Sequence, residues 1–94
     1  MWLYTTCGFF SVVEDRQEPD RLVVRARVRG DLDNLREQYL PELGPTIDTP
    51  ERDYQHRAYV GREDFARGLA ALAMDLHQNN FKESVAARRA THGP

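Results

Sequence analysis

The sequence contains few of the residues on which disulfide scaffolds, metal centres and phosphate loops depend. Cys7 is the only cysteine, so no internal disulfide can form. The three histidines and this cysteine follow no metal-ligand spacing, which leaves no zinc signature. The six glycines are scattered along the chain, which excludes a glycine-rich phosphate loop. We therefore expect no bound metal and no cofactor.

Long apolar segments are also missing. The longest stretch without a charged residue, 1–13, is too short and too polar to cross a bilayer. The same segment has neither the basic start nor the apolar centre of a secretory signal. A single cysteine suits a reducing compartment. We expect a cytoplasmic protein that makes no contact with membranes.

The chain has no excess of positive charge. Its 13 Lys and Arg residues are matched by 15 Asp and Glu residues, for a formal net charge of -2, whereas nucleic-acid-binding proteins usually show a basic excess or stripe. Lys82 is the only lysine, so nearly all of the positive charge is guanidinium. Hydrophobic residues make up 40% and charged residues 30%, which is typical of a soluble globular domain. With 94 residues, the chain has room for one domain with a modest core.

Alternating and helical patterns follow one another along the chain. A period of two predicts a half-buried strand, and apolar residues three and four apart predict an amphipathic helix. The predicted strands are 2–5, 9–13, 22–28, 46–48 and 54–60, and the predicted helices are 31–40 and 63–78. In the last strand, alternation places Tyr54 with His56 on the apolar face and Arg57 with Tyr59 on the other face.

This order of elements predicts an α+β fold. We expect a two-layer sandwich in which both helices cover one face of an antiparallel sheet, with a ferredoxin-like topology as the favoured arrangement. Residues 1–87 form the single domain in this interpretation, and 88–94 form a flexible C-terminal tail. The second face of the sheet is left open to solvent or to a partner.

The clearest candidate site is an arginine-rich face of this sheet. Basic residues two apart at the end of the 22–28 strand project together, and a basic and an aromatic residue of the 54–60 strand join them if the two strands are neighbours. These candidate binding residues are Arg25, Arg27, Arg29, Arg57 and Tyr59. Guanidinium groups bind phosphate and carboxylate in bidentate geometry, so the pattern predicts an anion-binding face. The alternative is a solvated face whose arginines are neutralised by acids of the 14–20 hairpin.

Two further features are secondary candidates. Phe9 offers a ring on which a base of single-stranded nucleic acid can stack. The residues Asn80, Phe81 and Lys82 combine a polar turn, an aromatic anchor and the only lysine. They form either a recognition corner or, as the simpler interpretation, a helix cap that closes the core.

No residues form a recognisable catalytic set. His56 lies on the apolar face of a predicted strand, where a core or edge position with one satisfied hydrogen bond is a simpler interpretation than a general base. Nothing in the spacing of Cys7 and His56 supports a nucleophile and its base. Glu63 and Asp64 suit the start of a helix, where the dipole favours negative charge. We therefore predict a protein that is not an enzyme.

Short words of sequence are distributed over most of residues 1–85. They are GFFSVV at 8–13, VRAR at 24–27 followed by Asp31-Leu32 and Leu35, Asp53-Tyr54 with Arg57, and Asn80-Phe81-Lys82. In these words the chain resembles a family of short uncharacterised bacterial proteins. That family has an Ile-Asp-Tyr-type run before Asn-Phe-Lys, where this chain has Leu76-His77-Gln78-Asn79. The resemblance implies a shared fold unit and no activity, and it places Arg25, Arg27, Arg57 and Phe81 within the pattern.

Three functions follow as hypotheses. The first is a small binding protein that uses the arginine-rich face to hold a protein partner or an anionic ligand, or that pairs with itself through a sheet edge. The second is a phage or mobile-element inhibitor of a host protein, such as a component of a defence system. Its acidic loops, 14–20 and 48–53, would imitate nucleic acid. The third is a single-strand nucleic-acid binder, which the net charge disfavours.

Overall fold

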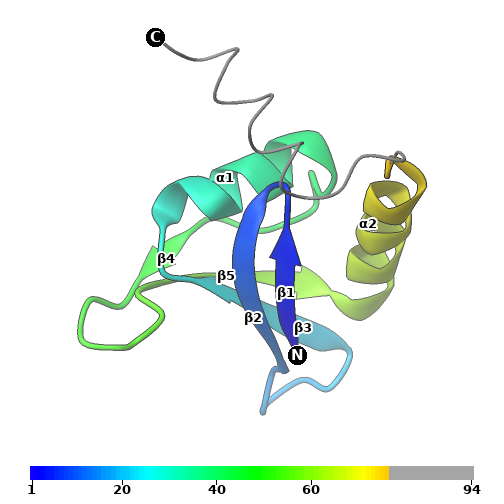
Figure 1. The fold of residues 1–94 in the computed structure, drawn as a ribbon. Coiled ribbons are helices and arrows are strands. Elements are labelled where there is room, and N and C mark those ends of the chain that lie inside the picture. The colour runs from blue at the N-terminus through cyan, green and yellow to red at the C-terminus, as the bar shows by residue number, and fades with distance from the viewer. Residues whose placement is uncertain (77–94) are drawn as a thin grey trace, which may run out of the picture.

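A computed structural model of the chain describes residues 1–76. The elements in chain order are β1 (Trp2–Thr5), β2 (Gly8–Glu14), β3 (Arg21–Ala26), α1 (Arg29–Gln38), β4 (Ile47–Asp48), β5 (His56–Gly61) and α2 (Arg62–Met74). The strands form one antiparallel five-stranded sheet in the order β1-β2-β3-β5-β4 (Figure 1). The α+β class predicted from the sequence is confirmed.

The core lies on the face of the sheet against which the helices pack. Phe10, Val24 and Ala58 sit on three neighbouring strands and are all fully buried. Leu32 of α1 and Phe65 of α2 belong to the same cluster of buried side chains. Burying a large apolar side chain contributes about 1.5–3 kcal/mol, so this cluster is a main source of stability.

Helix α1 is fixed to the sheet at the start of β2. The carboxylate of Asp31 accepts a hydrogen bond from the backbone N–H of Phe9 at 3.2 Å. Gly8 has a φ of 144°, and a Cβ at this position would lie 2.2 Å from the Asp31 Cγ atom. This close approach requires glycine, because it has no Cβ and accepts a positive φ.

The ferredoxin-like topology is not confirmed. That arrangement places a helix directly after the first strand, whereas here a turn at Thr6 and Cys7 joins β1 to β2 and a hairpin at 15–20 joins β2 to β3. A helical crossover needs at least about 10 residues, which neither connection provides. The chain crosses only after β3, where α1 and the following loop lead to β4 at the far edge.

Helix α2 contains three of the four apolar residues of the predicted helical stripe. Phe65 is buried, and Leu69 and Leu72 pack against the core from α2. Leu76, which the stripe included, follows the end of the helix at Met74 and is 65% exposed. The predicted residues that lie outside the described part of the chain are Asn80, Phe81, Lys82 and the tail 88–94.

Candidate anion-binding face

The second face of the sheet carries one continuous row of side chains across all five strands. The register places Trp2, Ser11, Arg25, Arg57 and Ile47 opposite one another, in the strand order β1-β2-β3-β5-β4. Their neighbours along the strands belong to the core, so these side chains project away from it. We call this surface the outer face. Its strand residues are Trp2, Tyr4, Phe9, Ser11, Val13, Arg21, Val23, Arg25, Ile47, Arg57 and Tyr59.

Arg25 and Arg57 form a cross-strand pair of like charge at the centre of this row. The Arg25 Nη2 donates a hydrogen bond to the Ser11 hydroxyl at 2.6 Å, which holds the guanidinium against β2. The Nε of Arg57 is buried and has no hydrogen-bond partner among the described residues. Like charges directly opposite each other destabilise a sheet, and a buried donor without an acceptor costs still more. The arrangement therefore disfavours the free protein and suits an added negative charge.

Tyr54 belongs to this arginine cluster, which corrects the prediction that it shares the core face with His56. The Cζ atoms of Arg25 and Arg27 each lie 5.0 Å from the centroid of its ring. The reason is that β5 begins only at His56, so strand alternation does not extend back to Tyr54. A turn closed by the hydrogen bond from the Thr49 N–H to the Gln55 carbonyl sets its position instead.

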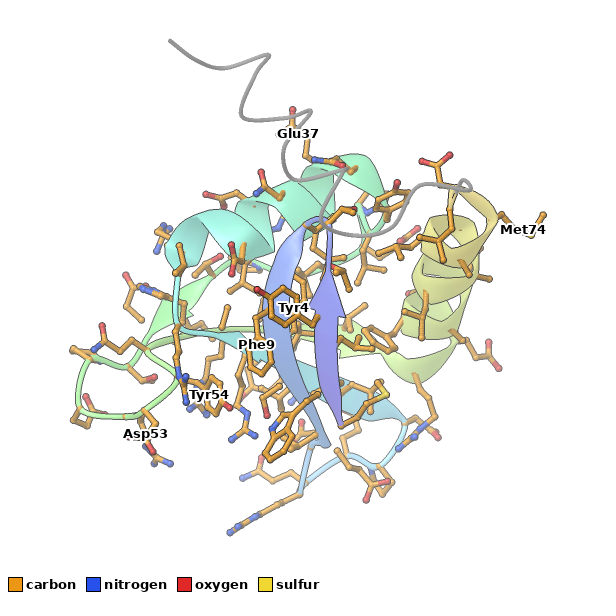
Figure 2. All side chains as sticks on the ribbon, in the orientation of Figure 1. Tyr4, Phe9, Glu37, Asp53, Tyr54 and Met74 are labelled. Carbon is orange, nitrogen blue, oxygen red and sulfur yellow. The ribbon has the colours of Figure 1, made fainter. Side chains whose placement is uncertain are left out.

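The cluster surrounds an open hollow of about 220 Å³, lined by Arg25, Arg52, Asp53, Tyr54 and Arg57. Asp53 is the only carboxylate in this lining. Figure 2 shows Asp53 and Tyr54 in the loop before β5, on the side of the molecule away from α2. The hollow thus brings three guanidinium groups and one aromatic ring together around a single carboxylate.

Five arginines that do not line the hollow form ion pairs with carboxylates. The arginines that pair with carboxylates are Arg21, Arg29, Arg36, Arg62 and Arg67. Within residues 1–76, the arginines without an ion pair are Arg16, Arg25, Arg27, Arg52 and Arg57. All of these except Arg16 surround Tyr54 or line the hollow. The expected alternative of neutralisation by the hairpin is wrong for these residues, since Glu14 pairs with Arg62, and Asp15 and Glu18 pair with Arg21.

Arg29 does not belong to the outer face, although its spacing predicted that it would. Strand β3 ends at Ala26, and Arg29 is the first residue of α1, so the alternation stops before it. Its guanidinium pairs with Asp48 at 2.9 Å, and the Nδ1 of His56 lies 2.7 Å from the same carboxylate. The contact with His56, together with the charge of Arg29, holds the pKa of Asp48 below its usual range. His56 is thus a partly buried residue at the start of β5, between β3 and β4, and its ring contacts Asp48.

Tyr59 lies on the outer face, in a row with Val13 and Val23. Its ring stacks under Arg21, whose Cζ lies 4.5 Å from the ring centroid. Arg21 also forms an ion pair with Asp15 at 2.6 Å, and the hydrogen bonds from Gln17 and Arg21 lower the pKa of that carboxyl. Tyr59 therefore has its own arginine, separate from the pair formed by Arg25 and Arg57.

Aromatic rings extend the outer face over β1 and β2. Trp2 is 74% exposed and Tyr4 is 72% exposed, which is unusual for side chains with this much apolar area. Tyr4 and Phe9 form an edge-to-face pair with ring centroids 5.8 Å apart, and both are labelled in Figure 2. Phe9 was a predicted candidate. Trp2 and Tyr4 were missed, although their spacing of two in a predicted strand indicated a shared face.

Three other features would mark a second site among the described residues: a cluster of metal ligands, a membrane-spanning helix and a reactive cysteine. Residues 1–76 contain no group of three His, Cys, Asp or Glu side chains able to hold a metal ion. Neither helix in this part of the chain is long and apolar enough to cross a membrane. Cys7 is buried, and burial disfavours a reactive thiolate.

Comparison of the chain with protein-family models, with curated proteins and with solved structures finds no match in any of the three.

Proposed function

We propose that this chain is a small non-enzymatic binding protein whose outer face holds an anionic group, presented by a ligand or by a partner protein. The observation that carries the proposal is the pair of Arg25 and Arg57, which lie opposite each other with no carboxylate partner among the described residues. A phosphate or carboxylate between the two guanidinium groups supplies the missing negative charge. Arg52 lines the same hollow, and Arg27, stacked on Tyr54, adds a further positive charge beside it.

The size of the hollow supports recognition of a group rather than of a whole molecule. Its volume of about 220 Å³ is below the roughly 300–1,000 Å³ of sites that enclose small ligands. The hollow is also open to the outer face, so a bound phosphate or carboxylate would remain attached to a larger molecule outside it. Tyr59 lies on the same face, in the row next to that of Arg25 and Arg57.

A titration with inorganic pyrophosphate and with citrate tests this proposal. The side-chain Nε–H signals of Arg25 and Arg57, followed by ¹H–¹⁵N NMR, should shift and saturate with at least one anion. Arg25→Gln combined with Arg57→Gln should weaken binding by about tenfold or more, because a charged hydrogen-bonded pair is worth at least 1.4 kcal/mol. Arg16→Gln is the matched control, since Arg16 is also unpaired but lines no part of the hollow. No saturable shift, or an equal loss in Arg16→Gln, overturns the proposal.

The inhibitor hypothesis has less support from the charges of its acidic loops. In the 14–20 loop, Glu14 and Asp15 are engaged by Arg62 and Arg21. In the 48–53 loop, Asp48 is engaged by Arg29. An imitation of nucleic acid needs a contiguous acidic patch, and these pairings reduce the negative charge that the loops present.

A further inference from the structure

We infer that the anionic ligand of the outer face is single-stranded nucleic acid, with bases stacked on Trp2 and Tyr4 and the backbone held by Arg25 and Arg57. This inference rests on the function proposed above and names its ligand. The observation behind it is that the exposed rings and the unpaired arginines occupy one face of one sheet.

The register gives this face a definite geometry. Trp2 and Arg57 belong to the same row and are separated by Ser11 and Arg25. Neighbouring strands lie about 4.8 Å apart, so the backbone positions of Trp2 and Arg57 are about 14 Å apart. RNA-binding sheets that stack two or three bases on their aromatic residues work over a similarly short span of strands. Ser11 lies between the rings and the guanidinium groups, and the Arg25 guanidinium covers its buried side chain, which brings positive charge toward the rings.

The rings and the charges suit the two parts of a nucleotide. Trp2 and Tyr4 expose most of their surface although both are attached to an ordered strand. Every base has an aromatic face that stacks on such rings, and every phosphate carries a charge that guanidinium groups bind. An acidic peptide would use the arginines but has no aromatic face to stack on the exposed rings. The face therefore fits nucleic acid better than an acidic protein segment.

A single strand fits this face better than a duplex. In a duplex the bases stack on one another and are not available to protein rings, whereas unpaired bases can be splayed onto them. A sheet of five strands is also too broad for the major groove, which admits a helix or a two-stranded ribbon. Both helices pack on the other face of this sheet, through Leu32 and Phe65.

The net charge of -2 does not count against this ligand, because the acids are unevenly placed. No strand residue of the outer face is an Asp or Glu, and Asp53 is the only carboxylate that lines the hollow. Other acids form ion pairs with arginines that do not line the hollow, such as Glu14 with Arg62 and Glu42 with Arg67. The local field over the row of Arg25 and Arg57 is therefore positive although the whole chain is slightly acidic.

Trp2 provides a direct measurement, because it is the only tryptophan. Titration of the full chain with oligo(dT) and oligo(U) at about 50 mM salt should quench its fluorescence to saturation, since a stacked base contacts the indole. A duplex of the same length should not quench it. Contacts to two or three phosphates predict that the logarithm of affinity falls against the logarithm of salt with a slope of about -1.4 to -2.1. Arg57→Gln should reduce that slope by about 0.7.

Variants separate this inference from the proposed function. By anisotropy of a labelled oligonucleotide, Trp2→Ala and Tyr4→Ala should each weaken binding about tenfold, while pyrophosphate binding stays unchanged. Met74→Ala is the matched control, since Met74 is 85% exposed on α2, on the far side of the molecule in Figure 2.

Three outcomes decide the matter. Pyrophosphate binding without quenching by oligonucleotides overturns this inference and leaves the proposed function standing. Tighter binding of a poly-glutamate peptide than of oligonucleotides overturns it in favour of a protein ligand. If the protein binds none of pyrophosphate, citrate, oligonucleotides and poly-glutamate, both this inference and the proposed function are overturned.

Discussion

Replacing Arg57 with methionine should make the free protein more stable, although it removes a residue that the proposed function needs. Methionine keeps most of the apolar stem while removing the charge and the buried Nε. That buried donor has no partner among the described residues, and such a donor costs about 1–3 kcal/mol. Relief of the like-charge contact with Arg25 adds about 0.2–1 kcal/mol. Some packing is lost in exchange, so we expect a net gain of about 1–2 kcal/mol.

Urea unfolding followed by far-UV circular dichroism measures this gain. A gain of 1 kcal/mol corresponds to a rise in the urea midpoint of about 0.3–1 M, because m is about 1–3 kcal/mol/M for small proteins. Arg16→Met is the control and should change stability by less than about 0.5 kcal/mol, because Arg16 is exposed and unpaired. Arg57→Lys separates the two causes, since lysine keeps the charge but has no Nε, and it should recover only the part due to the buried donor.

The reasoning fails if Arg57→Met unfolds at lower urea than the wild type or at the same urea. Either result would mean that Arg57 already has a partner which satisfies its charge and its Nε. Added pyrophosphate provides a second check. It should stabilise the wild type, by about 2.7 kcal/mol at 100 times its Kd, and leave Arg57→Met nearly unchanged.

Three further predictions concern stability. Gly8→Ala should lower the free energy of unfolding by more than about 1 kcal/mol, because the new Cβ meets the Asp31 carboxylate and the φ of 144° strains alanine. Asp15→Asn should flatten the loss of stability below about pH 4, because folding lowers the pKa of the Asp15 carboxyl. The stability that the ionised Asp15 contributes is fully present above the pKa of the unfolded chain. It is lost as the pH falls through the lower pKa of the folded protein. Arg36→Met should cost about 2 kcal/mol, because Arg36 donates to two carbonyls and a hydroxyl of the loop before β4. Urea titrations, at a series of pH values for Asp15→Asn, measure all three.

Each of these has a comparison that can contradict it. Gly30→Ala, where a Cβ meets nothing within 4 Å, should instead stabilise α1 by about 0.5–1 kcal/mol. Equal effects at the two glycines would refute the argument from close approach. Parallel acid curves for the wild type and Asp15→Asn would show that the contacts with Gln17 and Arg21 do not stabilise the fold. Full stability in Arg36→Met would mean that the loop holds its place without this side chain.

The local pattern was sufficient to find most of the elements. Alternation located β3 and β5 to within a few residues, because a sheet with one buried face needs a period of two. The apolar spacing located both helices for the corresponding reason. The boundaries were less certain at Arg29 and Tyr54, where the pattern continues by chance beyond the strand. As a result, the prediction wrongly placed Arg29 in the site and left Tyr54 out of it.

The site itself depends on register, which the pattern does not contain. Arg25 and Arg57 are separated by a helix and a loop, and only the pairing of β3 with β5 sets them opposite each other. The same pairing of distant strands aligns Trp2 with them across Ser11. A shift of one residue in either register would have turned these side chains into the core.

The sequence by itself determined the α+β class, the amphipathic faces, the exclusion of disulfides and the concentration of positive charge in arginine. These follow from composition and from periods that span a few residues. Only the tertiary structure decided which arginines are neutralised, because an ion pair such as Arg62 with Glu14 joins residues far apart in the chain. It also decided that the unpaired arginines gather around Tyr54, since the folding of the loop before β5 brings that ring to the end of β3.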